Sequence, residues 1–123
     1  MFRSIALASV LVVGSAFAAS AQTANIVGSY SYTGTMTDGS VEDPGTLKVT
    51  AQPSGAYEVK WDGGDYVGIG QVQGNLLAIA SVVDGKNTIM MMTINPDGTL
   101  AGKWWRRTDP GAKGTEVWAP SKK

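Results

Sequence analysis

The residues of this chain best suited to recognition are its large aromatic and sulfur-containing side chains. Tryptophan and tyrosine combine a flat apolar ring with one hydrogen-bond donor, and methionine adapts to apolar partners of varied shape. Side chains of this kind line pockets for small molecules, where an arginine could meet an anionic group. The candidate ligand-binding residues are Tyr30, Tyr32, Trp61, Met90, Met92, Trp104 and Arg106. The same aromatic residues equally suit a filled protein core, so both interpretations stay open.

A dense group of aromatic and basic residues occupies segment 104–107, Trp-Trp-Arg-Arg. Successive side chains of a strand point to opposite faces, so one of the two tryptophans must face away from the core. An outward Trp beside Arg has the composition of a protein-binding hot spot. We therefore consider Trp105, Arg107 and, near the C-terminus, Trp118 as a partner-binding patch. The alternative is a cation–π stack of Trp and Arg that closes one end of the fold.

Few residue types in this chain can perform catalysis. The chain contains no His and no Cys, which excludes a Ser-His-Asp triad, a cysteine nucleophile, a thiolate zinc site and any disulfide. A carboxylate-based enzyme remains as a third hypothesis, and it predicts a cleft that joins two or more of Asp38, Glu42, Asp43 and Asp65. Because such charges in polar loops are normally only solvated, we assign no catalytic residue.

We expect neither a metal site nor a cofactor. Segments 62–65 and 95–98 contain the oxygen ligands that calcium prefers, but tight turns demand the same residues and neither segment supplies a full ligand set. Ten Lys and Arg residues balance ten Asp and Glu residues. The chain therefore has no excess of positive charge that would attract it to nucleic acid or to an anionic lipid surface.

The first 21 residues have the three parts of a secretory signal peptide. One positive charge at Arg3 precedes an apolar stretch over 5–14, and small residues follow it. Cleavage fits after Ala18 or Ala21, and we favour Ala21, which predicts a signal peptide over 1–21 and a mature domain over 22–123. The apolar stretch is well short of the roughly 20 residues that cross a bilayer. We therefore expect an exported protein, periplasmic or extracellular, without a membrane anchor.

The candidate side chains need a scaffold, and the mature sequence predicts one made of strands. Apolar and polar residues alternate over 47–52 and 57–62, as in half-buried antiparallel strands. The residues predicted to face the core there are Leu47, Val49, Ala51, Tyr57, Val59 and Trp61. Turn signals, the last of them Pro110-Gly111, separate the predicted strands 26–36, 45–52, 56–62, 65–73, 75–83, 87–95, 99–107 and 114–119.

The short connections between these strands indicate how they are ordered. Nearly all are of hairpin length, which favours a meander in which each strand pairs with the next. Closure into a barrel would leave no exposed sheet edge. We therefore predict an all-β, single-domain, antiparallel up-and-down barrel of about eight strands. Such a barrel is just wide enough to be filled by side chains or to hold one small ligand.

Segment 27–30, Val-Gly-Ser-Tyr, lies at the start of the first predicted strand. It is similar to the Gly-x-Trp that begins the first strand of calycin-type barrels, with Tyr30 in place of the tryptophan. The sequence thus resembles this group of barrels, which includes lipocalins, fatty-acid-binding proteins and avidins. A Trp-Arg pairing from segment 104–107 adds to the likeness. Segments 57–61, 66–70 and 97–104 are also similar to a group of small exported bacterial proteins of unsettled function. The resemblance implies the fold and no activity.

Two main function hypotheses follow from this fold. The first is a non-catalytic exported binding protein that takes a small apolar or amphipathic ligand into the barrel mouth. The alternative is a protein-interaction module, of inhibitor or adhesion type, that uses the outer Trp105 and Arg107 patch. The barrel interior distinguishes them, because a cavity of a few hundred Å³ favours a small molecule and a filled interior favours the module.

Overall fold

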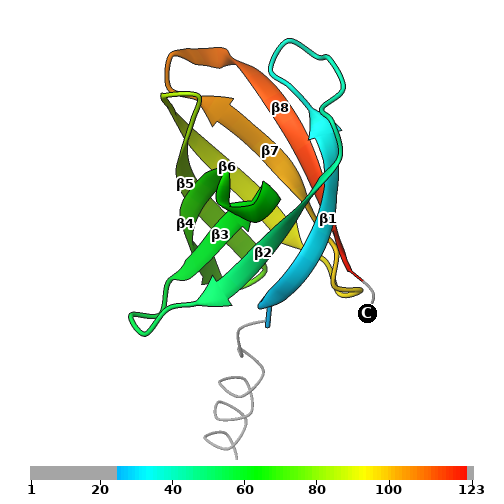
Figure 1. The fold of residues 1–123 in the computed structure, drawn as a ribbon, viewed down its shortest axis with the longest axis vertical. Coiled ribbons are helices and arrows are strands. Elements are labelled where there is room, and N and C mark those ends of the chain that lie inside the picture. The colour runs from blue at the N-terminus through cyan, green and yellow to red at the C-terminus, as the bar shows by residue number, and fades with distance from the viewer. Residues whose placement is uncertain (1–24, 122–123) are drawn as a thin grey trace, which may run out of the picture.

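The computed structural model describes residues 25–121, so the predicted signal peptide over 1–21 lies outside the described residues. The described chain is all-β, and its strands pair in chain order and close into a barrel (Figure 1). This confirms the predicted fold class. The elements are β1 (Gly28–Thr35), β2 (Gly45–Ala51), β3 (Tyr57–Trp61), the 3₁₀ turn η1 (Asp62–Gly64), β4 (Tyr66–Gln73), β5 (Leu76–Val83), β6 (Lys86–Ile94), β7 (Leu100–Arg106) and β8 (Asp109–Pro120).

The first and last strands close the barrel by pairing with each other. In the β1–β8 ladder, Tyr32 lies opposite Trp118, and both side chains are buried. β1 pairs with β2 along its other edge. Closure satisfies the backbone groups that an open sheet would leave exposed at its two edges.

One predicted turn is wrong. The chain does not turn at Pro110-Gly111, because β8 already begins at Asp109 and the connection from β7 is residues 107–108. Arg106 lies opposite Asp109, and the register of the two strands shifts between Trp105 and Arg106. Proline is tolerated in a strand at such an irregularity, because no regular ladder hydrogen bond is required of it there.

The alternation predicted for β2 and β3 is largely confirmed. Leu47, Val49, Val59 and Trp61 are buried, and Tyr57 is half-buried. Ala51 is exposed, contrary to the prediction, because it lies at the end of β2 where the barrel wall stops. The buried apolar core consists of Ile26, Tyr30, Tyr32, Leu47, Val49, Val59, Trp61, Leu77, Ile79, Met90, Met92, Ile94, Leu100, Trp104 and Trp118.

The barrel has two different ends. We call the end that carries connections 52–56, 74–75 and 95–99 the closed end. Ile26 is buried there, and the Tyr30 hydroxyl donates a hydrogen bond to the Ile26 carbonyl oxygen at 2.7 Å. We call the opposite end the open end, and it carries loop 36–44, η1 and connections 84–85 and 107–108 (Figure 1).

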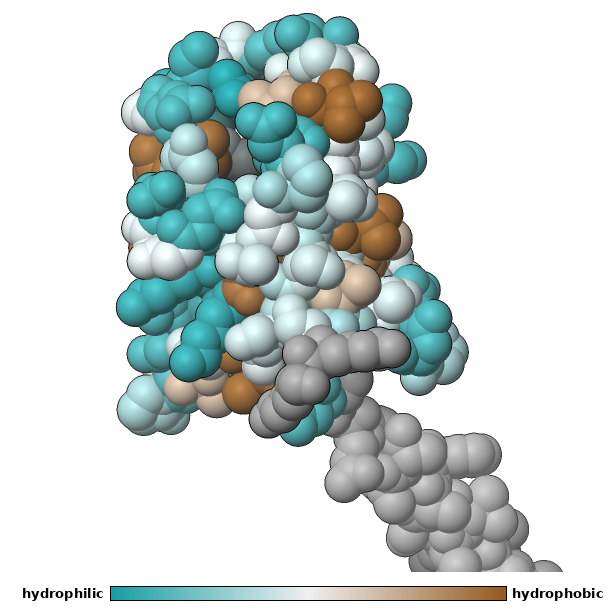
Figure 2. Space-filling model, turned by 45° about the vertical axis from the view of Figure 1, so that its right-hand side comes forward, coloured by the Kyte–Doolittle hydropathy of each residue, from teal (hydrophilic) through white to brown (hydrophobic). Residues whose placement is uncertain are grey.

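The outer surface is mostly polar. Figure 2 shows one face on which apolar residues form small separate groups among hydrophilic ones. In the described part of the chain, the large apolar side chains exposed to solvent are Val27, Val41, Val67, Ile69, Val82, Ile89 and Val117. Helices able to cross a membrane, by length and apolar character, are absent from residues 25–121.

Candidate functional site

A cavity of about 280 Å³ lies at the open end of the barrel. This volume is close to the lower end of the range for small-molecule pockets. Its lining residues are Tyr32, Met36, Glu42, Asp43, Trp61, Asp62, Tyr66, Ser81, Val83, Asp84, Thr88, Met90, Trp104 and Glu116. The interior is therefore packed toward the closed end and hollow toward the open end.

The structure brings four of the predicted ligand-binding residues to this cavity. They are Tyr32, Trp61, Met90 and Trp104, which come from four different strands. Tyr30 and Met92 do not line it. The Tyr30 ring packs against Trp118, with ring centroids 5.6 Å apart, and Met92 is completely buried. Both residues belong to the packed core.

Arg106 lies at the rim of the open end and does not line the cavity. Its guanidinium carbon is 5.6 Å from the centroid of the Trp104 ring, a cation–π arrangement. Its Nη2 atom is 4.0 Å from Oδ2 of Asp84, which follows β5. Trp104 and Arg106 thus form the aromatic–arginine stack that the sequence offered as an alternative.

The prediction that Trp118 joins an outer patch is wrong. Trp118 has no exposed surface. It lies opposite Tyr32 of β1 and Leu100 of β7, which both face the interior, so closure of the barrel sets its direction. Trp105 is half-buried and Arg107 is exposed.

Glu116 lines the cavity, and two indole N–H groups hold its carboxyl group in place. Glu116 is only 3% exposed, and its Oε1 accepts hydrogen bonds from Nε1 of Trp61 at 2.9 Å and Nε1 of Trp118 at 2.8 Å. The two rings meet edge to face, with centroids 6.2 Å apart and an angle of 78°. These two hydrogen bonds fix the position of Oε1 and so orient the Glu116 carboxyl group.

Glu42, in the loop between β1 and β2, lies beside Glu116. Its backbone N–H donates to the Gly34 carbonyl oxygen at 2.9 Å, which folds loop 36–44 back along β1. Burial and the nearby charge of Glu116 raise the pKa of Glu42 to about 8. Burial also raises the pKa of Glu116, although the indole hydrogen bonds act in the opposite direction. The two acids therefore behave as a coupled pair that retains a proton near neutral pH.

Tyr32 and Asp62 form a second polar contact in the cavity wall. The Tyr32 hydroxyl donates to Oδ2 of Asp62 at 2.6 Å, and the backbone N–H of Thr46 donates to Oδ1 at 3.2 Å. Burial, followed by this hydrogen bond, raises the pKa of Tyr32 above its usual value. The phenol of Tyr32 therefore stays protonated. Asp62 connects β1 and β2 through its two hydrogen bonds.

Two glycines provide the space that these side chains occupy. A Cβ on Gly45 would overlap Oδ1 of Asp62 and the Tyr32 ring. A Cβ on Gly114 would overlap the indole of Trp104. A glycine at an inward position of a strand is a sequence signal for such close packing.

Three buried polar atoms at this end lack a hydrogen-bond partner within the described chain: Oε1 of Glu42, Nε1 of Trp104 and Nε of Arg106. Most buried polar atoms in proteins are paired. Glu42 and Trp104 are both lining residues of the cavity.

In comparisons with known proteins, no family model and no curated protein matches this chain. The barrel is compatible with a calycin-like fold.

Sequence reasoning missed several acidic residues of the site. Glu116 and Trp118 are two residues apart in β8 and both face the interior. The alternation of side chains along this strand was the sequence signal that could have identified Glu116. Asp62 was weighed only as a turn residue or a calcium ligand, and Asp84 lies between the predicted strands 75–83 and 87–95. Glu42 and Asp43, considered only as candidate catalytic acids, both line the cavity. A cleft of this kind suits binding as well as catalysis, so the non-catalytic expectation stays a prediction.

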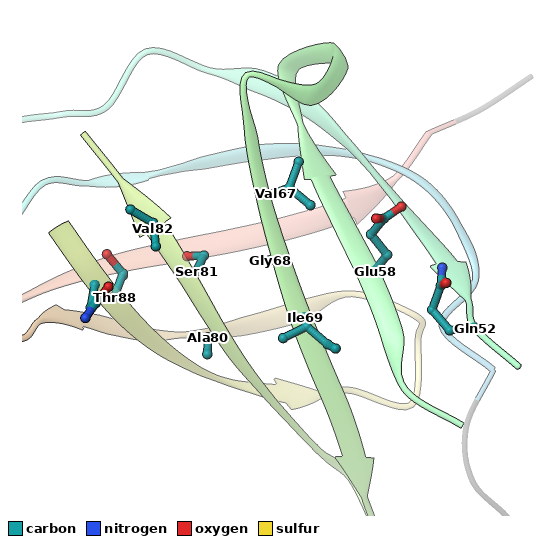
Figure 3. Close-up of a pocket in the computed structure, with 10 residues that line it drawn as sticks. Gln52, Glu58, Val67, Gly68, Ile69, Ala80, Ser81, Val82 and Thr88 are labelled. Atoms are coloured by element: carbon teal, nitrogen blue, oxygen red, sulfur yellow. The ribbon is translucent and has the colours of Figure 1, made fainter. Parts of the chain in front are cut away.

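The outer wall offers a second candidate surface. Figure 3 shows Val67 and Ile69 of β4 beside Ala80 and Val82 of β5, next to a shallow outer groove. Further along the wall, a separate hollow is lined in part by Ile89, Trp105, Arg107 and Pro110. The two residues of the predicted outer patch therefore share one hollow.

Proposed function

We propose that this chain is a non-catalytic exported binding protein that takes a small apolar or amphipathic ligand into the open-end cavity. The observation that carries the proposal is the hollow itself, about 280 Å³ in volume. Its aromatic and sulfur-bearing walls suit the apolar body of a ligand. The unpaired atoms of Glu42 and Trp104 suit a polar group that fixes the orientation of the ligand.

Intrinsic tryptophan fluorescence tests this proposal, because Trp61 and Trp104 line the cavity. We expect a saturable spectral shift when the purified protein is titrated with a panel of small amphipathic compounds. Trp104→Phe should reduce the shift, whereas Trp105→Phe, on the outer wall of the same strand, should preserve it. The proposal fails if no compound shifts the spectrum and a ligand-free crystal structure shows a solid interior.

Export is a separate part of the proposal. Its support is the pattern of residues 1–21, with cleavage favoured after Ala21. Mass spectrometry of the protein from the producing cell should then find Gln22 at the N-terminus, in the periplasmic or culture fraction. An uncleaved chain in the cytoplasmic fraction would contradict it.

A protein-interaction module is the second candidate function. The observation that favours it is the hollow shared by Trp105 and Arg107 beside the exposed side chain of Ile89. Tryptophan and arginine are enriched in the energetic centres of protein interfaces. The double variant Trp105→Ala and Arg107→Ala should abolish capture of a partner in a pull-down and leave the fold intact, while Lys48→Ala on the far wall should not affect capture.

A further inference from the structure

We infer that the open-end cavity takes a small organic cation, an amine or ammonium group on an apolar body, with its positive head between Glu42 and Glu116. This inference rests on the proposed binding function and names the class of ligand. It follows from the charge of the cavity, from its buried unpaired carboxyl group and from its aromatic walls.

The charge of the cavity is one-sided. Five acidic residues line it, and the lining contains no Lys or Arg: the acids are Glu42, Asp43, Asp62, Asp84 and Glu116. The nearest basic group, Arg106, already pairs with Asp84 and stacks on Trp104. An anionic ligand would be repelled here, and a purely apolar one would leave buried carboxyl groups without compensation.

The buried carboxyl pair provides a specific place for a positive head. Glu116 is almost completely buried, lines the cavity and accepts both indole hydrogen bonds on Oε1. No ion pair in that part of the chain involves Glu116 or Glu42. Oε1 of Glu42 is buried and has no hydrogen-bond partner. Glu42 and Glu116 lie beside each other as a coupled pair, so a cation between them would take the place of the proton that the pair retains.

The walls around this pair suit an organic cation. Tyr32, Trp61, Tyr66 and Trp104 contribute aromatic surface, and cations bind favourably over aromatic faces. Trp104 already carries one cationic group, the Arg106 guanidinium, over its ring. A bare metal ion fits less well, because no three acidic side chains in the described chain are grouped as metal ligands would be.

A matched set of probes tests the inference by isothermal titration calorimetry. The probes are 2-phenylethylamine, its neutral analogue 2-phenylethanol and the anion 3-phenylpropionate, each measured on the purified protein at pH 7.5. We expect the amine to bind at least about tenfold more tightly than the alcohol, because only the amine gains charge-assisted contacts. The carboxylate should bind most weakly of the three.

Two variants test the position of the head group. Glu42→Gln and Glu116→Gln should each weaken amine binding about tenfold and leave alcohol binding unchanged. The amide side chain introduced by Glu116→Gln retains an oxygen able to accept the indole hydrogen bonds, and circular dichroism checks the fold. Asp38→Asn is the control, because Asp38 lies in the same loop, is exposed and does not line the cavity.

The protonation of the pair provides an independent readout. Glu42 faces Glu116 of β8, Asp62 of η1 and the Tyr32 phenol of β1, and a bound cation should displace the proton that the pair retains. The affinity for phenyltrimethylammonium, which is permanently charged, should rise about tenfold from pH 7 to pH 9 in the native protein. The rise should disappear in Glu42→Gln.

The outcomes separate this inference from the proposed function. Preference for the amine, lost in both glutamine variants and kept in Asp38→Asn, supports the inference. Equal binding of all three probes, tighter binding of the carboxylate, or a flat pH profile overturns the inference and leaves the proposed binding function standing. If neither these probes nor the amphipathic panel binds, both fail.

Discussion

The closed and open ends of this barrel are built from similar aromatic residues but differ in how polar groups are satisfied. At the closed end, the Tyr30 hydroxyl is paired with the Ile26 carbonyl oxygen, and Trp118 is completely buried. At the open end, buried atoms of Glu42 and Trp104 lack partners within the described chain. The closed end is therefore packed and paired, whereas the open end retains buried polar atoms without partners in the described chain.

The strongest test of the comparison is to truncate one tryptophan at each end. Trp118→Ala should cost about 3–5 kcal/mol of unfolding free energy, because it leaves a cavity in packed surroundings and removes a hydrogen bond to Glu116. Trp104→Ala should cost less, about 1–3 kcal/mol, since its indole already borders a hollow. Urea unfolding measures both, and equal losses would contradict the contrast.

A pair of glycines in β8 tests how tightly the open end is shaped. Gly114→Ala should cost about 1–3 kcal/mol and displace the Trp104 indole, because the new Cβ would overlap that ring. Gly111→Ala is the matched control: no heavy atom lies within 4 Å of a Cβ there, and a change within about 0.5 kcal/mol is expected. Thermal unfolding and cavity-probe binding check both variants.

The coupled carboxyl pair predicts that stability depends on pH. Glu42 ionises near its ordinary value of 4.5 when unfolded and with a pKa of about 8 when folded. Between these values the folded protein holds a proton that the unfolded chain has lost, so stability falls as the pH rises toward 8. Because Glu42 is partly exposed, solvent screens part of the effect.

We therefore expect a loss of about 1 kcal/mol between pH 5 and pH 9, a fall in Tm of about 4–8 °C. Calorimetry on the native protein measures this fall, and Glu42→Gln should remove most of it. A Tm that rises over this range in the native protein would show that the pair is not protonated as proposed.

The smallest effects should come from two tyrosine hydroxyls. Tyr30→Phe and Tyr32→Phe each remove one hydrogen bond and should each cost about 0.5–1 kcal/mol. Only Tyr32→Phe should also change the affinity of a cavity ligand, because Tyr32 lines the cavity and Tyr30 does not. If Tyr30→Phe and Tyr32→Phe change ligand affinity equally, the proposed difference in function between the closed and open ends is wrong.

Much of the fold could be predicted because strand alternation and turn residues are local signals. Glycine and proline turns divide the chain correctly except at 110–111, where the strand irregularity depends on pairing with β7. Alternate side chains of a strand face the same side, and this rule predicted that Tyr32, Trp61, Met90 and Trp104 face the interior, where the structure places them. Trp118 was assigned to the wrong face because its direction depends on the β1–β8 ladder, which joins the two ends of the domain.

By itself, the sequence determined an eight-stranded meander with aromatic residues inside, since alternation and turn chemistry act between near neighbours. Only the tertiary structure decided which aromatic residues are consumed in packing and which border a hollow. It also brought Glu42 and Glu116, which are distant in the chain, into one coupled pair. The physical reason is that burial and charge coupling depend on distance in space, and barrel closure sets those distances.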